Sequence, residues 1–373
     1  MTRTDLAPVA DFPPVFAFTE EHAALRGVLR RFFDTAEATR SPGYGWRTLL
    51  GGLGAEDIIF ARPRDETGAT PVDLAILAEE AGAALYPGPL LAGAALGPAL
   101  VGAAGESGTP GAGSGPWPGI ALSAGFLGAA RDPLPGISGS DGMRLSGVVE
   151  PVLNLDGAGL IGCPALIDGA PVLALLRADA PGVTVTDLSA LDPAQPLGRI
   201  ECRDVTPESV ILDGADLEAV RRRAHLVMAA DLLGVAQRSF ERTVEYVGRR
   251  VQFGRTIGSF QAIKHRLADL VTQVELTRSA VYGAAWQLTV APTDPRTERD
   301  LAVAGALASG TATAVTKAAV QLHGGIAITW EHPAHRYLRR AHQTAAFTGG
   351  ASAYRHRLAA LIDLEEERHG SGA

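Results

Sequence analysis

The sequence contains little lysine and few cysteines, and its overall charge is negative. Only two of its 33 basic residues are lysines, and 41 acidic residues leave a net charge of −8. Nucleic acids and anionic membranes bind preferentially to basic surfaces, so we expect neither as a partner. The scarcity of lysine indicates the codon bias of a GC-rich genome rather than a site, because exposed cations are largely interchangeable. We expect a small-molecule ligand.

The two cysteines, Cys163 and Cys202, are too few for a disulfide framework or a cysteine-based metal cluster. The N-terminus also lacks the basic region and apolar core of a secretory signal, so we expect a cytoplasmic protein. The uncharged run 81–105 is long enough to suggest a membrane span. Its prolines and glycines would leave backbone groups unpaired in lipid, so we predict short buried helices there.

The remaining residues change periodicity along the chain. Thr19 is a candidate N-cap, and 71–84 has the apolar spacing of a buried helix. Residues 102–119 are almost all glycine, serine, proline and alanine, which predicts a link between domains. Short β-like segments separated by turns then occupy 119–212.

After residue 213 the apolar period becomes helical again. It predicts a bundle of about four long helices, near 216–251, 257–290, 298–322 and 350–366. The expected division is an N-terminal helical domain, a middle β domain and a C-terminal helical bundle domain, with bounds 1–116, 117–214 and 215–373. A chain of 373 residues is long enough for this, because single cores rarely grow beyond about 250–300 residues.

Two motifs in the last part carry a resemblance to a known family. They are 249-RRVQFGRTIGSFQAIKHRLADL-270 and 321-QLHGGIAITWEHPAHRYLRRA-341. At this separation, and within an α–β–α order that covers nearly the whole chain, they resemble the acyl-CoA dehydrogenase family. The resemblance implies that family's α+β fold: an N-terminal helical domain, a middle β-barrel-like domain and a C-terminal four-helix bundle. It also implies an oxidoreductase that uses FAD on an acyl-CoA thioester.

The resemblance further implies that seven residues contact FAD, namely Arg250, Gln252, Phe253, Gln261, Gln321, Gly324 and Gly325. A pyrophosphate needs positive or N–H-rich surroundings, and glycines permit a close backbone approach. In the family these positions reach the ADP half of an FAD held mainly by the neighbouring subunit, so the implied oligomer is at least a dimer. Taken singly, Phe253 could instead be a core residue, and the glycine pair a helix C-cap.

The family's chemistry requires a carboxylate base for the acidic α-proton of the thioester, because a hydroxyl or amide cannot accept it near neutral pH. Matching the second motif without a gap places the usual base position at Thr348, in the segment 346-AFTGGASAYR-355. A minority of family members carry the base on the preceding long helix, and that position is Ala224. Neither position holds a carboxylate, so the catalytic residue is unknown.

Other family patterns are also missing. The segments 120-IALSAGFLG-128 and 148-VVEPVLNLDGAG-159 lack the Thr-Glu-Pro-Gly-like and Trp-Ile-Thr-like patterns that cover the flavin ring. His225 stands where an arginine that contacts substrate is common. The residues that would serve a neighbour's cofactor are therefore present, whereas those that would serve this subunit's own flavin and substrate are degraded.

Other candidate groups are weaker. Glu331, His332 and His335 have a spacing that could suggest a metal, but Pro333 interrupts the helix needed to align them, so we expect no metal site. Asp231 and Glu241 could be relocated bases, although charged residues on a helix usually form its solvated face. No Ser/His/Asp order or Walker-type loop is present, which argues against hydrolysis and phosphoryl transfer.

Three hypotheses remain. In the first, the chain is the base-lacking subunit of a heteromer, a heterotetramer with a homologous catalytic subunit. Steroid side-chain CoA thioesters are one candidate substrate of that heteromer. Alternatively, the chain is a self-sufficient, self-associating dehydrogenase with a relocated base. In the third hypothesis, it is a non-redox homologue that binds a ligand or partner only.

Overall fold

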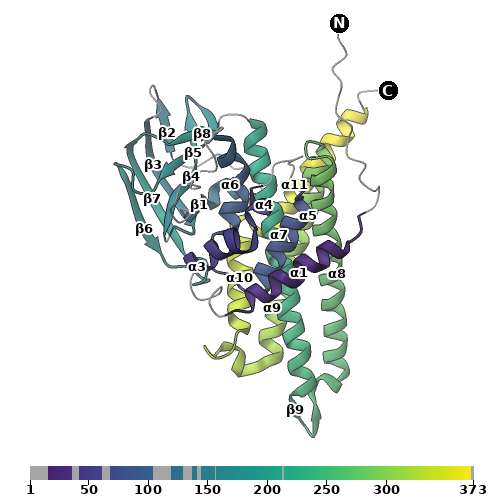
Figure 1. Ribbon diagram of the computed structural model, residues 1–373. Coiled ribbons are helices and arrows are strands. Elements are labelled where there is room, and N and C mark those ends of the chain that lie inside the picture. The colour runs from purple at the N-terminus through teal and green to yellow at the C-terminus, as the bar shows by residue number, and fades with distance from the viewer. Residues whose placement is uncertain are drawn as a thin grey trace.

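A computed structural model describes residues 16–35, 42–60, 68–103, 119–128, 137–140, 144–155, 157–211 and 214–370. Helices, a sheet and a second set of helices follow one another along the chain, in the order that the sequence predicts. Figure 1 shows the sheet on one side of the molecule and the long helices on the other. The predicted link at 102–119 lies mostly outside the described residues, since α6 ends at Ala103 and β1 begins at Gly119.

The N-terminal helices begin where their caps predict. Thr19 accepts a hydrogen bond from the backbone N–H of His22 and starts α1, Glu20–Phe33, as expected. Thr70 caps α5 in the same way. That helix spans Pro71–Ala83, and α6 spans Leu90–Ala103; the elements between α1 and α5 are short, namely α3 (Pro42–Arg47), η1 (Thr48–Gly52) and α4 (Glu56–Ile59).

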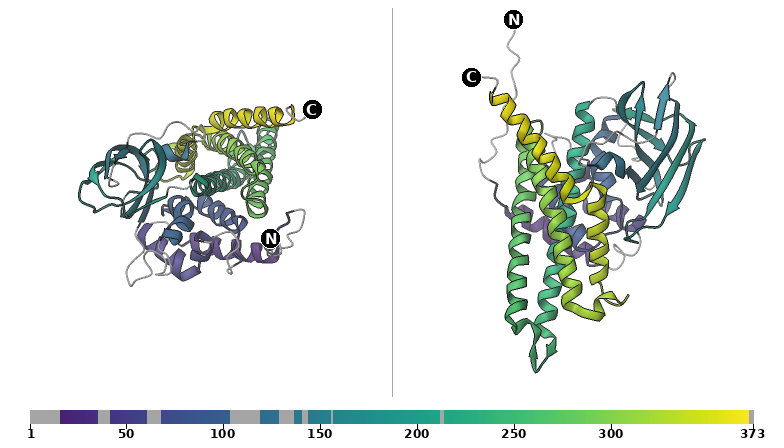
Figure 2. Two further views of the ribbon diagram at one scale, coloured as in Figure 1. Left: turned by 90° about the horizontal axis from the view of Figure 1, so that it is seen from above. Right: turned by 180° about the vertical axis from the view of Figure 1, so that it is seen from behind.

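The eight strands form one sheet in the order β6-β7-β3-β1-β4-β5-β8, with β2 against β3 and β4. They are β1 (Gly119–Ser123), β2 (Ile137–Ser140), β3 (Arg144–Leu153), β4 (Ala158–Ile167), β5 (Ala170–Arg177), β6 (Val183–Leu188), β7 (Leu197–Val205) and β8 (Ser209–Ile211), with η3 (Ala124–Leu127) after β1. The sheet curls strongly, as the view from above in Figure 2 shows, but in the described part its end strands β6 and β8 do not pair. Cys163 and Cys202 are buried and free, as small apolar residues would be.

The C-terminal helices run side by side (Figure 2). They and their connections are α7 (Gly214–Arg249), β9 (Val251–Gln252), β10 (Arg255–Thr256), η4 (Ile257–Ser259), α8 (Gln261–Val290), α9 (Pro295–His323), η5 (Gly324–Ile328), α10 (Ala334–Phe347) and α11 (Gly350–Gly370). β9 and β10 form a two-stranded hairpin that projects beyond the end of the bundle (Figure 1).

The described residues form two large apolar cores and one small cluster around Ala302 and Tyr354. One joins both helical parts and takes in a few side chains from the sheet, including Leu153, Leu173 and Leu175. The other lies among the strands alone. The helical parts approach each other closely at the crossing of α5 and α7, where Gly82 faces the backbone of Asp231 and Gly234 faces the backbone of Glu79. A side chain at either glycine would collide with backbone, so the crossing requires both.

Candidate cofactor site and base loop

The β9–β10 hairpin presents an aromatic ring to solvent at its turn. Phe253 and Gly254 both adopt left-handed backbone conformations, with φ of 54° and 76°. The Phe253 side chain is 91% exposed and meets the edge of the Phe260 ring at 6.3 Å between centroids. The alternative that Phe253 is a core residue is therefore wrong. A large apolar ring held clear of the protein in a strained turn is suited to contact with another molecule.

The polar residues of the first motif surround this turn. Arg250 is held through its backbone, since its N–H donates to the Tyr246 carbonyl and its carbonyl accepts from the Ile257 N–H, both at 2.8 Å. Within the described part of the chain no carboxylate pairs with its guanidinium, which is exposed. Gln252 and Gln261 are also exposed. The structure thus leaves the guanidinium and both amide side chains accessible, which is what an incoming phosphate or adenine edge requires.

The second motif forms an open turn. Gly324 ends α9 with φ 68° and ψ −148°, and its N–H donates to the Val320 carbonyl. A Cβ atom added to Gly324 or Gly325 would meet no atom within 4 Å, so the backbone there is uncovered. Gln321 is exposed one helical turn earlier. The helix C-cap alternative is correct for Gly324, but it leaves the turn free for the close approach of a ligand.

The structure brings the two motifs to one end of the helical bundle (Figure 1). The hydroxyl of Tyr246, on α7, donates to the carbonyl of His323, the last residue of α9, at 3.3 Å. The C-terminal ends of helices α7 and α9 are therefore in direct contact. A guanidinium, three amide side chains, an exposed ring and a bare glycine turn fit the pyrophosphate and adenine of a dinucleotide.

The segment 346–355, here called the base loop because it contains the family's usual base position, lies at the end of α10. Thr348 is 2% exposed, and its hydroxyl donates to the Ala345 carbonyl at 3.2 Å. Ala224, on α7, is completely buried. The hydroxyl of Thr348 is thus occupied within its own turn, and the methyl group of Ala224 offers no proton acceptor.

His225 lies next to this loop, because its ring meets the edge of the Tyr354 ring at 5.3 Å between centroids. Its Nε2 atom is buried and has no hydrogen-bond partner in the described residues. Burial lowers the pKa of His225 to about 4, opposed in part by the nearby carboxylate of Glu298. The imidazole is therefore neutral at pH 7, and its pKa is too low for an effective base in thioester α-proton removal.

Asp231 belongs to a buried ion-pair network rather than to the solvated face of α7. Its Oδ1 lies 3.3 Å from Nη1 of Arg340, whose Nε lies 2.5 Å from Oδ2 of Asp192. Burial raises the pKa of Asp231, and the charge of Arg340 opposes that rise. Asp231 borders a cavity of only about 20 Å³ with Tyr86 and Thr344, which has room for one water-sized group.

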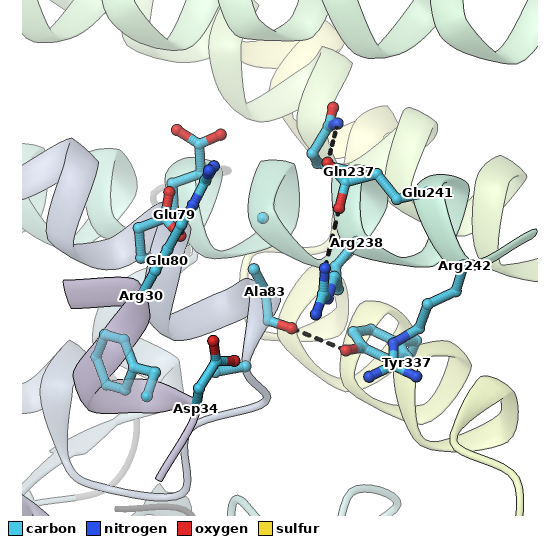
Figure 3. Close-up of a pocket in the computed structure, with 13 residues that line it drawn as sticks. Arg30, Asp34, Glu79, Glu80, Ala83, Gln237, Arg238, Glu241, Arg242 and Tyr337 are labelled. Carbon is cyan, nitrogen blue, oxygen red and sulfur yellow. Dashed lines mark hydrogen bonds and ion pairs between the residues drawn. The ribbon is translucent and has the colours of Figure 1, made fainter. Parts of the chain in front are cut away.

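A larger cavity, about 280 Å³, lies between α1, α5, α7 and α10 (Figure 3). Its walls are charged: Glu80 pairs with Arg30, and Glu241 pairs with Arg238 and accepts from the Gln237 amide. Glu241 thus stands in a solvated cleft with its own partners, which is the structural role expected of most helix-surface acids.

Two further findings concern metal ligands and membrane spans. Among the residues described, no three His, Cys, Asp or Glu side chains gather closely enough to hold a metal ion. Of the helices in the described ranges, none combines the length and the apolar run that a membrane crossing needs.

An N-terminal helical part, a curled middle sheet and a bundle of long helices together define the acyl-CoA dehydrogenase class of fold. The model of the family's C-terminal domain ("Acyl-CoA dehydrogenase, C-terminal domain") matches residues 221–360. The acyl-CoA dehydrogenase IpdE2 of Mycolicibacterium smegmatis is 31% identical over 90% of this chain and 92% of its own length. This chain therefore belongs to the acyl-CoA dehydrogenase family, whose enzymes oxidise a CH–CH bond of acyl-CoA thioesters.

Solved structures agree with this assignment. The ChsE4-ChsE5 complex from Mycobacterium tuberculosis matches with a TM-score of 0.77 and 26% identity, over 93% of this chain and 98% of that chain. A steroid ACAD, Tcur3481-Tcur3483, matches with the same TM-score and identity, over 93% of this chain and 99% of that chain. The predicted fold is confirmed.

Proposed function

We propose that this chain is the base-lacking subunit of a heteromeric acyl-CoA dehydrogenase and that it completes the FAD site of a homologous catalytic subunit. The main support is the contrast between two regions of the chain, the end of the helical bundle and the base loop. The end of the bundle presents exposed groups that suit a dinucleotide, whereas the base loop holds a buried threonine bonded to its own turn. Two solved structures of the same fold at 26% identity are named for two components, ChsE4-ChsE5 and Tcur3481-Tcur3483.

In this role Arg250 neutralises the pyrophosphate, the glutamines satisfy polar edges, and Gly324 and Gly325 let the backbone approach. Bound FAD supplies the hydride acceptor for the β-carbon of the thioester. The proton acceptor comes from the catalytic subunit. Ile328 and Trp330, which are 73% and 71% exposed beside the glycine turn, supply the apolar surface that the contact with that subunit buries. The steroid-type substrate is proposed from the relatives alone.

The experiment compares flavin content in two preparations: the chain alone, and the chain co-expressed with a candidate homologous catalytic subunit. We expect little FAD on the chain alone and bound FAD in the complex. Arg250→Ala should weaken FAD binding by the complex roughly tenfold to a hundredfold, since a charge-assisted hydrogen bond contributes about 1.5–3 kcal/mol. Arg203→Ala is the matched control, because Arg203 is an exposed arginine on the sheet paired with Glu201. A yellow homomer with one FAD per chain would contradict the proposal.

One observation favours a second candidate, a self-sufficient enzyme that uses Asp231 as its base. The pKa of this carboxyl is raised, and its Oδ2 atom is buried without a hydrogen-bond partner among the described residues. Against it, Arg340 holds the carboxylate and the adjoining cavity is too small for an acyl chain. Acyl-CoA-dependent dye reduction by the chain alone, abolished in Asp231→Asn, would establish this candidate. Absence of both turnover and flavin in any complex would favour a non-redox binding role.

A further inference from the structure

Tyr246 joins the two halves of the proposed cofactor site. Its backbone carbonyl accepts the N–H of Arg250 one helical turn later, at 2.8 Å. Its hydroxyl donates to the carbonyl of His323, the residue before Gly324. One side chain therefore links the helix end that carries the guanidinium to the helix end that carries the glycine turn.

His323 fixes the other side of this link. Its ring stacks on the Tyr246 ring at 4.3 Å between centroids and 26° between planes, and 6% of the residue is exposed. Its Nδ1 lies 2.7 Å from the Ala319 carbonyl, which can only accept, so Nδ1 carries the proton and donates. That bond fixes the ring orientation at the last turn of α9. The stack and the hydroxyl bond together restrain both position and tilt of the turn.

A third ring extends the contact. The His332 ring lies 4.6 Å from that of His323, and its Nδ1 accepts from the N–H of Ala334 at the start of α10. The segment between α9 and α10 is thus held by Tyr246 at His323, which precedes the glycine pair, and by His332 near the start of α10. Gly324 and Gly325 themselves have no side chain to anchor them, so their place depends on these neighbours.

We propose that Tyr246 and His323 are positioning residues that hold the Arg250 guanidinium and the Gly324 backbone in register on one pyrophosphate. This inference rests on the proposed FAD site. Neither residue needs to touch the cofactor, because each acts through the segment that it restrains. A pyrophosphate contacted from two chain segments is held well only when the segments keep a fixed separation, since small displacements weaken both contacts at once.

The test uses Tyr246→Phe in the complex with the catalytic subunit, which removes the hydroxyl and keeps the ring stack. The affinity for FAD should fall roughly two- to tenfold, the range for one net hydrogen bond. Tyr337→Phe is the matched control, because the Tyr337 hydroxyl also donates to a backbone carbonyl, that of Ala83 at 2.8 Å. The control should lose similar stability while keeping its affinity for FAD.

A double-mutant cycle distinguishes positioning from a general structural role. If Tyr246 acts through Arg250, Tyr246→Phe should cost much less FAD affinity in the Arg250→Ala background than in the wild type. His323→Gln, which retains an N–H donor for the Ala319 carbonyl, should bind FAD better than His323→Leu. Additive losses, or equal effects of Tyr246→Phe and Tyr337→Phe on FAD affinity, would overturn the inference.

The outcomes also separate this inference from the proposed function. If Arg250→Ala leaves FAD affinity unchanged, the assignment of the FAD site is wrong. The positioning role of Tyr246, which rests on that site, then fails with it. If Arg250→Ala weakens FAD binding and Tyr246→Phe does not, the assignment stands and the positioning role is wrong.

Discussion

Replacing Gly234 with alanine should destabilise the protein through the crossing of α5 and α7. The added Cβ would stand 1.9 Å from the carbonyl oxygen of Glu79 and 2.8 Å from the Ala83 nitrogen, both backbone atoms. No rotamer change can relieve this contact, so the two helices have to separate by about 1 Å, which places the cost near the upper end of the ~1–3 kcal/mol typical of overpacking. The shift also disturbs the Glu79 carboxylate, which pairs with Arg26 and Arg278.

The assay is the midpoint of thermal unfolding followed by circular dichroism, with Gly310→Ala as control. Gly310 is an exposed glycine of α9 where an added Cβ would meet nothing within 4 Å. The control should gain about 0.5–1 kcal/mol, because alanine loses less backbone entropy than glycine in a helix. The same substitution therefore has opposite signs at two helical positions. A midpoint for Gly234→Ala at or above that of the wild type would refute the reasoning.

Three further predictions concern buried polar groups and the base loop. Arg340→Met should cost about 3–5 kcal/mol of unfolding free energy, because it leaves Asp192 and Asp231 buried without their cation, and Arg340→Met combined with Asp231→Leu should recover part of that loss in urea titrations. The pKa of His225 is lowered to about 4 in the folded state, so its contribution is complete above the unfolded pKa of about 6.5 and is lost as pH falls from there towards 4. His225→Leu should therefore flatten the stability profile in that window, and an unchanged acid slope would contradict the assigned pKa. Thr348→Ala should leave acyl-CoA-dependent dye reduction by the complex nearly unchanged. Thr348→Glu should give the chain alone little or no activity, since a base without a correctly placed flavin and thioester is insufficient. Strong turnover by the wild-type chain alone, lost in Thr348→Ala, would show that the base loop is catalytic.

The strongly periodic elements were predictable from the sequence. Thr19 caps α1 as expected, and the predicted segments 257–290 and 298–322 correspond to α8 and α9, Gln261–Val290 and Pro295–His323. The strands from β1 (Gly119–Ser123) to β8 (Ser209–Ile211) all lie within the range 119–212 predicted to hold short β segments. Long apolar periods and clear turn residues decide such elements locally, so tertiary context changes only their ends.

Helix α10 was missed for a physical reason. The face that α10 buries includes the polar side chains of Arg340, Gln343 and Thr344, which a sequence pattern assigns to a solvated surface. Each of these side chains is satisfied by residues far away in the sequence. Arg340 pairs with Asp192, and the Gln343 amide bonds the backbone of Asp192 and Gln195. A single sequence gives no sign of such long-range partners.

The residues of the candidate site could be predicted from the sequence, but the contacts that hold them in place could not. The motif residues from Arg250 to Gly325 could be selected by chemistry and resemblance, and their FAD-binding role remains a prediction. The roles of Tyr246 and His323 depend on the meeting of α7 and α9 in space, 77 residues apart. The burial of Asp231 likewise depends on Arg340, which explains why a solvated helix face was the wrong expectation.

The two apolar cores divide the molecule mechanically. The N-terminal helices and the bundle share one core. A displacement of the β9–β10 hairpin is therefore transmitted through closely packed side chains to α1 and α5. The strands have a core of their own, but Leu153, Leu173 and Leu175 also pack into the helical core and anchor the sheet on the helices. The pair between Arg340 and Asp192 ties a loop of the sheet to α10 across that boundary. Separating the sheet from the helices therefore requires both breaking this ion pair and exposing those leucines to water.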